Sequence, residues 1–267
     1  MPSRLVTPRF ENGIAVLTLD HPPANTYSYD LMRELDEAIL TARMDDAVHV
    51  IVLVGAGDRF FCGGADIPML AAATPAFKYN FCLHANETLC RLEQTPKLVI
   101  AALNGHTVGG GLEIALAADI RIARKGAARF GLPEIKLGVL PGTGGTQRLA
   151  RLVGKARAIE LMITGRLMPV EDAAALGLVN AVWDEGTLAG REFLDAVLAY
   201  AADFVPPRCA AGAVGRIKRA VQSGPESSLS EGLSLERELQ QLLFQGDDAR
   251  EGLGAHLAKR EPRFTGR

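Results

Sequence analysis

Two glycine-rich loops and two carboxylates are the groups in this chain best suited to chemistry. The loops are Gly63-Gly64 and Gly109-Gly110-Gly111, and the carboxylates are Glu113 and Glu134. Glycine has no Cβ, so the backbone N–H groups of such loops can approach a ligand closely. One N–H from each loop could hold a single carbonyl oxygen and stabilise a developing oxyanion. Two carboxylates nearby would supply a general acid and a general base.

Glu113 stands out within its own segment. Between Leu98 and Ala118 it is the only charged side chain, and its nearest helix neighbours are Ile, Leu and Ala. A carboxylate in such surroundings is costly unless it is partnered or functional. On this stretch alone, Glu113 could serve catalysis, meet an arginine from elsewhere or point to solvent.

Several other candidates have ordinary structural explanations. Gly63-Gly64 could be a simple turn, and Glu134 could be a solvated turn residue. Asp66 could cap the helix that follows it. Cys62 is expected to pack rather than react, because no histidine lies in a recognisable motif with it.

Other chemistries fail on spacing. The sequence has no G-x-x-x-x-G-K-[ST], no G-x-S-x-G and no H-E-x-x-H. Gly55-Ala56-Gly57 lacks the third glycine of a dinucleotide fingerprint, because Phe60 stands there. The cysteines form no C-x-x-C pair, so we expect no metal site and four ordinary buried thiols. They are Cys62, Cys82, Cys90 and Cys209.

The elements that must position these residues follow from periodicity and punctuation. Val48–Val54 and Leu98–Leu103 are near-continuous apolar runs, typical of strands buried on both faces. Asn12-Gly13 lies between two alternating segments and predicts a hairpin. Ser28 predicts the start of one helix, and Thr74-Pro75 predicts the start of another.

One pattern repeats weakly along the chain. An apolar strand, a glycine loop and a helix occur at Val50–Ile67 and again at Leu98–Ala118, with a looser third copy at Phe130–Leu152. Such spacing favours stacked units. Stacking would place the glycine loops at equivalent ends of neighbouring strands. From Leu188 onward the pattern is helical to the end.

Composition limits the class of protein. Of 267 residues, 48% are hydrophobic, which is enough for a sizeable core. Lys and Arg number 29 against 31 Asp and Glu, a net charge of -2 that does not favour nucleic acid. The N-terminus lacks the apolar core of a signal peptide, and no apolar run could span a bilayer. We therefore expect a soluble cytoplasmic protein.

Five motifs in order resemble the enoyl-CoA hydratase (crotonase) family, and the resemblance covers essentially the whole chain. They are Phe61–Ile67, Asn104–Glu113, Phe130–Glu134, Leu140–Leu149 and the closing Arg250-Glu251-Gly252 with Lys259–Phe264. The resemblance implies an α/β fold: a crotonase-like spiral of repeated β-β-α units with a helical C-terminal region. Residues 1–195 would form the spiral core. Residues 196–267 would serve oligomerisation and cover the active site, in homotrimers or hexamers.

The resemblance also implies roles for single residues. Gly63 and Gly110 would form the oxyanion hole, and Glu113 and Glu134 would be the catalytic glutamates. Because both glutamates are present, hydration of an enoyl-CoA thioester, as in fatty acid β-oxidation, is favoured over isomerisation, dehalogenation or decarboxylation. No cofactor is implied, since coenzyme A is part of the substrate. The residues implied to lie along coenzyme A are Gly64, Ala65, Asp66, Ile67 and Lys259.

Two alternatives remain open. One is an enoyl-CoA isomerase, or a hydratase for a branched, cyclic or aromatic acyl group. The other is an RNA-binding crotonase homologue that would use a basic helix face between Arg148 and Arg157, although the net charge counts against it. Tyr27 stands where the family more often has a smaller or aliphatic residue, so it could alter ligand fit or simply pack.

Overall fold

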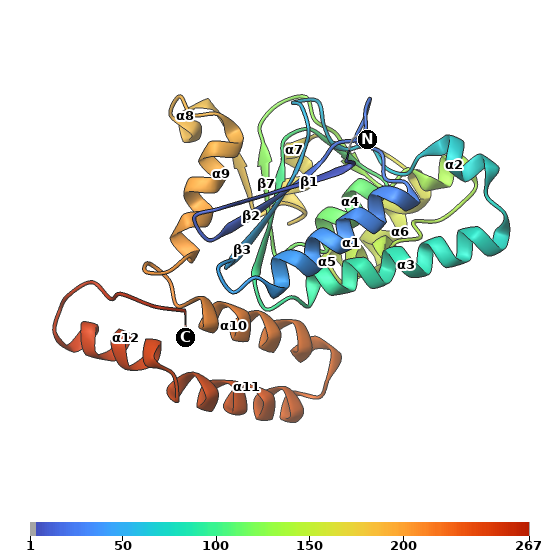
Figure 1. Ribbon diagram of the computed structural model, residues 1–267. Coiled ribbons are helices and arrows are strands. Elements are labelled where there is room, and N and C mark those ends of the chain that lie inside the picture. The colour runs from blue at the N-terminus through green and yellow to red at the C-terminus, as the bar shows by residue number, and fades with distance from the viewer. Residues whose placement is uncertain (1–3, 267) are drawn as a thin grey trace.

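The main layer of the protein is a six-stranded sheet with parallel pairing except at one edge (Figure 1). The computed structural model describes residues 4–266. Only the first pair of strands is antiparallel, and the other neighbours are parallel. In spatial order the strands are β1 (Val6–Glu11), β2 (Ile14–Leu19), β3 (Val50–Gly55), β5 (Leu98–Leu103), β7 (Ile120–Arg124) and β9 (Ala181–Trp183).

A second, smaller sheet carries the loops that were singled out from the sequence. Its three short strands are parallel and ordered β4-β6-β8. The glycines of both loops directly follow two of these strands, so the loops leave the same edge of one sheet. The strands are β4 (Phe60–Cys62), β6 (His106–Val108) and β8 (Phe130–Gly131).

The chain visits the two sheets in a repeating β-β-α order. Each unit gives one strand to the large sheet, the next to the small sheet, and then forms one or more helices. The predicted spiral of β-β-α units is therefore confirmed, although the third unit begins at β7 rather than at Phe130. The helical parts of the units are α2 (Ile67–Ala72) and α3 (Pro75–Glu93), then α4 (Gly110–Leu116), then the 3₁₀ turn η1 (Glu134–Leu137) and α5 (Gly145–Val153).

Local signals in the sequence explain the turns and caps. Asn12 and Gly13 both have positive φ, +49° and +80°, as a tight two-residue hairpin turn requires. The Ser28 hydroxyl accepts the Leu31 N–H at the start of α1 (Tyr29–Met44). Thr74 does the same for α3. These predictions hold because each depends on a few neighbouring residues.

Both faces of the large sheet are buried, which explains the uninterrupted apolar runs. Along β3, Val50, Val52 and Val54 face the cluster that contains α9 (Phe193–Ala201). Ile51 and Leu53 face the larger cluster on the opposite side, which includes residues from α1, α3 and α4. Two further helices add buried residues to this larger cluster, α6 (Lys155–Thr164) and α7 (Val170–Ala175). The short helix α8 (Glu185–Leu188) has no buried residue.

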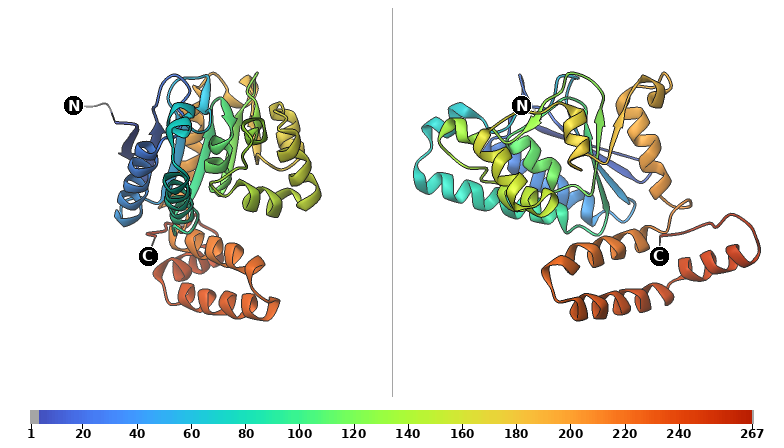
Figure 2. Two further views of the ribbon diagram at one scale, coloured as in Figure 1. Left: turned by 90° about the vertical axis from the view of Figure 1, so that its right-hand side faces the viewer. Right: turned by 180° about the vertical axis from the view of Figure 1, so that it is seen from behind.

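The last three helices leave the core as an arm (Figures 1 and 2). The boundary predicted between residues 195 and 196 falls inside α9, whose Phe193, Val197 and Ala201 pack on the large sheet. The departure from the core begins with the next helix. The arm helices are α10 (Ala211–Ser223), α11 (Leu229–Phe244) and α12 (Asp247–Leu257).

A buried ion pair fixes the base of the arm to the core. Lys218 on α10 places its Nζ 2.7 Å from Asp119 Oδ2 and 3.0 Å from the Lys97 carbonyl oxygen. Gln222, one turn later, donates to Asp119 Oδ1 at 3.2 Å and to the Glu93 carbonyl oxygen at 2.8 Å. Since these groups are shielded from water, their pairing resists separation of α10 from the sheet.

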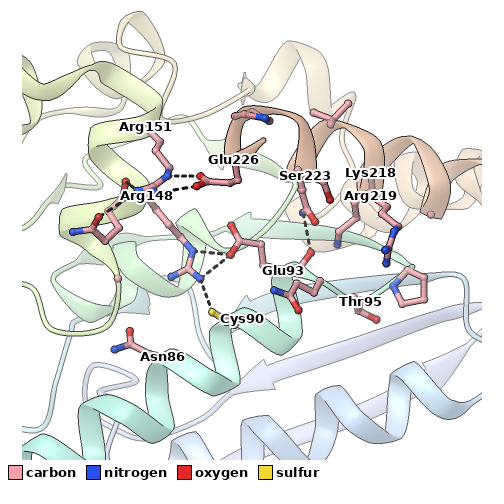
Figure 3. A pocket seen from close by; sticks show the side chains of 18 of the residues that line it. Asn86, Cys90, Glu93, Thr95, Arg148, Arg151, Lys218, Arg219, Ser223 and Glu226 are labelled. Carbon is pink, nitrogen blue, oxygen red and sulfur yellow. Dashed lines mark hydrogen bonds and ion pairs between the residues drawn. The ribbon is translucent and has the colours of Figure 1, made fainter. Parts of the chain in front are cut away.

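A cleft lies between this arm and the core, and charged pairs line it (Figure 3). Arg148 on α5 contacts Glu93 at 2.7 Å, and Arg151 contacts Glu226 at 2.7 Å. The Arg148 side chain is only 13% exposed, so it contributes little to the basic helix face that the RNA-binding alternative would use. The lining includes neither of the two glutamates proposed for catalysis.

The expectation of four buried thiols is correct only for Cys62. Cys82 and Cys209 are half-buried, and Cys90 is exposed beside Arg148. All four are free thiols. Cys62 packs beneath the glycine loops, and burial raises the pKa of its thiol to about 12. It is therefore a protonated packing residue, as expected from the sequence.

Candidate active site

Glu113 is carried into the interior by the glycine loop before it. Gly109 turns the chain with φ of +57°, a conformation that favours glycine. A side chain at Gly111 would overlap the Cys62 carbonyl group, so α4 can begin in direct contact with β4 only because this residue is glycine. As a result, Glu113 is only 1% exposed.

Backbone groups, not an arginine, stabilise the Glu113 carboxylate. Its Oε1 accepts the N–H of Thr143 at 2.8 Å and the N–H of Gly145 at 2.7 Å. Both donors belong to the loop that leads into α5. A buried carboxylate with two such bonds is held in its ionised form more readily than one without them.

Glu134 lies nearby in a different environment. It opens η1, and its Oε1 approaches the start of α4 closely enough that a Cβ at Gly109 would come within 3.1 Å. Its Oε2 is buried and has no hydrogen-bond partner among residues 4–266. Therefore this carboxyl group lacks the support that Glu113 receives.

These environments separate the acid–base properties of the two groups. Burial, and then the negative charge of Glu113, raise the pKa of Glu134 to about 7. Burial also raises the pKa of Glu113, but the N–H groups of Gly145 and Thr143 oppose that shift. The Lys78 ammonium on α3 acts on both carboxyl groups in the opposing direction. The arrangement favours Glu113 as the carboxylate and Glu134 as the group that keeps a proton.

The structure contradicts the assignment of Gly63 to the oxyanion hole. The Gly63 N–H already donates to the Ala24 carbonyl oxygen at 2.8 Å. A side chain at this position would contact Ala24 as well. The N–H of Gly63 is thus part of the fold and is not available to a ligand.

The free N–H lies two residues later, at Ala65. Tyr27 pairs with this segment, donating to the Gly64 carbonyl oxygen at 2.9 Å and accepting the Asp66 N–H at 3.0 Å. The Ala65 N–H therefore points to the opposite edge, and it has no backbone acceptor within residues 4–266. That edge faces Gly110, since a Cβ at Gly64 would lie 3.7 Å from the Gly110 nitrogen.

The position of Gly110 is compatible with its expected role in the oxyanion hole. It is the first residue of α4, so its N–H has no partner within the helix. No other backbone acceptor for this N–H is found in the described part of the chain. Ala65 and Gly110 therefore present two unused donors from adjacent loops.

Of the remaining residues predicted to contact coenzyme A, two lie beside the site and one lies on the arm. Asp66 caps α2 by accepting the Met69 N–H at 2.7 Å, as its structural explanation anticipated. Ile67 begins α2 and is 50% exposed beside the site. Lys259 follows α12 on the arm, so one chain does not bring it to the glutamates (Figure 1).

Sequence reasoning missed one contact in the site. Tyr27 was noted as a departure from the family, but its partner was not. Its side chain is 3% exposed, its hydroxyl lies 2.9 Å from Thr143 Oγ1, and its ring stacks on Phe81 with centroids 5.6 Å apart. The available signal was a threonine within Pro141–Gly145, a loop otherwise made of proline and glycine.

Residues 4–266 contain neither a candidate metal site nor a candidate membrane span. No cluster of three or more His, Cys, Asp or Glu side chains has an arrangement that could bind a metal ion. Within the same residues, the helices are all too short or too polar to cross a membrane.

Comparison with known proteins identifies a family for the chain. The family model described as enoyl-CoA hydratase/isomerase matches residues 9–267. The chain is 35% identical over 254 residues to a short-chain-enoyl-CoA hydratase of Clostridium acetobutylicum, covering 94% of each chain. It is 36% identical over 268 residues to the 2,3-dehydroadipyl-CoA hydratase of Escherichia coli, covering 99% of this chain and 100% of the relative.

A solved structure extends the similarity to three dimensions. A crystal structure of an enoyl-CoA hydratase from Geobacillus kaustophilus superposes with a TM-score of 0.94 at 42% identity. The match covers 100% of this chain and 98% of that one. Fold and sequence therefore point to the same family along the whole chain.

The environment of Glu134 predicts a pH-dependent effect on stability. Its folded-state pKa of about 7 exceeds the ordinary value, so this carboxyl group lowers the free energy of unfolding as pH rises from about 4 to about 7. Glu134→Gln removes that loss. The melting temperature of the variant, relative to wild type, should therefore be higher near pH 8 than near pH 4.

A matched control is available at Glu226. Its carboxylate is exposed, and the Arg151 guanidinium lowers its pKa. Glu226→Gln should not stabilise the protein near pH 8. A melting-temperature difference for Glu134→Gln that is the same at both pH values would contradict the raised pKa.

Proposed function

This chain belongs to the enoyl-CoA hydratase/isomerase family, and we propose that it adds water across the 2,3 double bond of a 2-enoyl-CoA thioester to give a 3-hydroxyacyl-CoA. One observation carries the proposal. Two neighbouring glutamates lie in contrasting environments, one supported by two backbone N–H groups and the other with a pKa of about 7. Such a pair supplies a base and an acid at the same pH.

The proposed mechanism begins at the thioester. Its carbonyl oxygen would accept the N–H groups of Ala65 and Gly110, which draws electron density from the double bond and makes the β-carbon electrophilic. Glu113 would take a proton from water as the water oxygen bonds to that carbon. Glu134 would give its proton to the α-carbon. A proton passing from Glu113 back to Glu134 after product release would restore both groups.

The oxyanion donors and the acid–base groups would contribute similar factors to the reaction rate. Donors of this kind supply about 10²–10³ in rate, and a positioned acid or base supplies about 10²–10⁴. In the proposed mechanism both glutamates act from the same side of the substrate, so the addition would be syn. An isomerase moves one proton between two carbons and needs no second group to activate water. The presence of both Glu113 and Glu134 therefore favours hydration.

A second candidate substrate has a carboxylate at the far end of its acyl group. Lys78 is half-buried, and no ion pair with it occurs among residues 4–266. Its Nζ lies 5.4 Å from the centre of the Phe81 ring and would be 3.9 Å from a Cβ at Gly142. This ammonium could meet a distal carboxylate, and the similarity to a 2,3-dehydroadipyl-CoA hydratase supports testing that substrate beside crotonyl-CoA.

The RNA-binding alternative has less support. The helix face on which it would depend carries glutamate partners. Arg151 pairs with Glu226 at 2.7 Å and Arg157 pairs with Glu160 at 2.7 Å. Much of the positive charge needed to release counterions from a phosphate backbone is thereby compensated.

Hydration of crotonyl-CoA, followed by loss of the enoyl-thioester absorbance, tests the proposed reaction. Wild type should consume the substrate, and Glu113→Gln should lower kcat by about 10²–10⁴ because the water loses its base. Binding of the thioester should persist. Glu171→Gln, an exposed position on α7, serves as the control. Wild type that binds both enoyl thioesters yet hydrates neither would overturn the hydratase assignment.

The donor assignment predicts opposite behaviour for two variants of Ala65. Ala65→Pro removes the N–H and should lower kcat/KM by about 10²–10³. The fold should persist, since this N–H makes no backbone hydrogen bond in the described chain. Ala65→Gly retains the N–H and should lose far less activity. Equal activity of the two, with matching circular dichroism spectra, would exclude Ala65 as a donor.

We further propose that the arm assembles the chain into homotrimers or hexamers. Large apolar side chains lie exposed along α11 and α12, where water would be an unfavourable neighbour. A neighbouring copy would also be needed to bring a Lys259 near the thioester. The exposed arm residues include Leu229, Leu233, Leu242, Phe244, Leu253 and Leu257.

Light scattering after size-exclusion chromatography tests the assembly. Wild type should have three or six times the 28.5 kDa mass of one chain. Leu257→Glu combined with Phe244→Glu should reduce that mass, because charged groups would be buried at the interface. Met44→Glu, also at an exposed apolar position but on α1, should leave it unchanged. A monomeric wild type would refute the proposal.

A further inference from the structure

Thr143 connects the base to the rest of the site through every polar atom it has. Its N–H donates to Glu113 Oε1 at 2.8 Å, and its carbonyl oxygen accepts from Arg148 Nη1 at 3.4 Å. Its hydroxyl oxygen lies 2.9 Å from the Tyr27 hydroxyl oxygen. The residue is only 2% exposed, so water does not compete for these contacts.

Thr143 supports Glu113 through its backbone, and its hydroxyl is held by Tyr27. The Thr143 N–H donates to Glu113 Oε1 at 2.8 Å. The two hydroxyl oxygens lie 2.9 Å apart, and either can be the donor. Burial, and then the charge of Glu113, raise the pKa of Tyr27 well above its ordinary value. Tyr27 therefore stays protonated, and its hydroxyl contacts the residue whose N–H supports the base.

Both loops of the site hold the Tyr27 ring in place. A side chain at Gly110 would overlap the ring, which therefore lies directly against the start of α4. Phe81 stacks on the ring, and the Tyr27 backbone pairs with Gly64 and Asp66. The hydroxyl thus has a fixed place relative to both proposed oxyanion donors before any ligand binds.

We propose that Tyr27 is a positioning residue whose hydroxyl acts through Thr143 to hold the Glu113 carboxylate in the orientation that activates water. The inference rests on the proposed hydratase function and adds a residue to its mechanism. Tyr27 does not exchange protons with the substrate in this scheme. It holds Thr143 in place and hence the backbone N–H that donates to the base.

Several other groups face this hydroxyl pair and enter any pH dependence. Lys78 on α3 and Glu134 on η1 interact with the Glu113 charge. Cys62 and Cys82 lie near Tyr27. Cys62 stays protonated, with a pKa of about 12. The acidic limb of a profile of kcat/KM against pH therefore reports Glu113, and the alkaline limb reports Glu134.

Tyr27→Phe is the direct test, because it removes the hydroxyl and keeps the ring against Gly110 and Phe81. We expect kcat for crotonyl-CoA to fall about three- to tenfold, the usual effect of losing one hydrogen bond in such a network. KM should stay within about twofold. The acidic limb of kcat/KM should move to higher pH, since the Glu113 carboxylate loses support.

Variants of Thr143 show whether the two hydroxyls act as one unit. Thr143→Val should match Tyr27→Phe, and the double variant should be no worse than either single change. Thr143→Ser keeps the hydroxyl and should retain more activity than Thr143→Val. Tyr29→Phe is the matched control, since its side chain is exposed and its hydroxyl has no partner within residues 4–266.

The outcomes separate this inference from the proposed function. An inactive wild type refutes the hydratase assignment itself. An active wild type, with unchanged kcat and pH profile in Tyr27→Phe, overturns the positioning role. Additive effects of Tyr27→Phe and Thr143→Val overturn it as well. A change confined to KM that grows with acyl length would show Tyr27 to be a wall of the acyl pocket instead. If Thr143→Val does not fold, Tyr27→Phe and Thr143→Ser still decide the question.

Discussion

The two hydrogen bonds from backbone N–H groups to Glu113 Oε1 are the interaction on which the site depends. A carboxylate that is 1% exposed would be costly without them. The donors, Thr143 and Gly145, lie in a loop that must approach α4 closely. Arg148 holds the following helix to Glu93 on α3, so an ion pair outside the site keeps the donors in place. The relative positions of α3, α4 and α5 therefore determine the hydrogen bonds to Glu113 Oε1.

Glu134 is a buried carboxyl group without such support from backbone N–H groups. It lies in the same site, but its Oε2 has no partner within residues 4–266, and its pKa is about 7. Burial raises the pKa of both carboxyl groups, but only Glu113 has the opposing hydrogen bonds from Gly145 and Thr143, so two chemically identical side chains differ through their surroundings alone. The fold stabilises one charge with backbone dipoles and leaves the other carboxyl group without them. That asymmetry costs stability above neutral pH. In the proposed mechanism it also supplies the proton for the α-carbon.

The sequence predicted the features that depend on near neighbours. The hairpin at Asn12-Gly13, the helix starts at Ser28 and Thr74, and the buried strands all follow local patterns. The β-β-α order comes instead from the resemblance to the family. The choice between Gly63 and Ala65 could not be predicted this way. It depends on residues 24–27, which occupy one edge of that loop and leave the other free. The position of Lys259 on the arm could not be predicted for a similar reason, since motif order does not reveal where an arm points.

The hydrogen bond between Tyr27 and Thr143 likewise could not be predicted from the sequence. The two residues are 116 positions apart, and neither position alone indicates a hydrogen bond. Only when Gly110 leaves room for an aromatic ring does the Tyr27 hydroxyl reach the loop that supports the base. A smaller aliphatic residue at position 27 would leave the Thr143 hydroxyl without that partner. A threonine in the loop and a tyrosine at position 27 therefore make chemical sense together, as a local elaboration of the hydrogen bonding around Glu113.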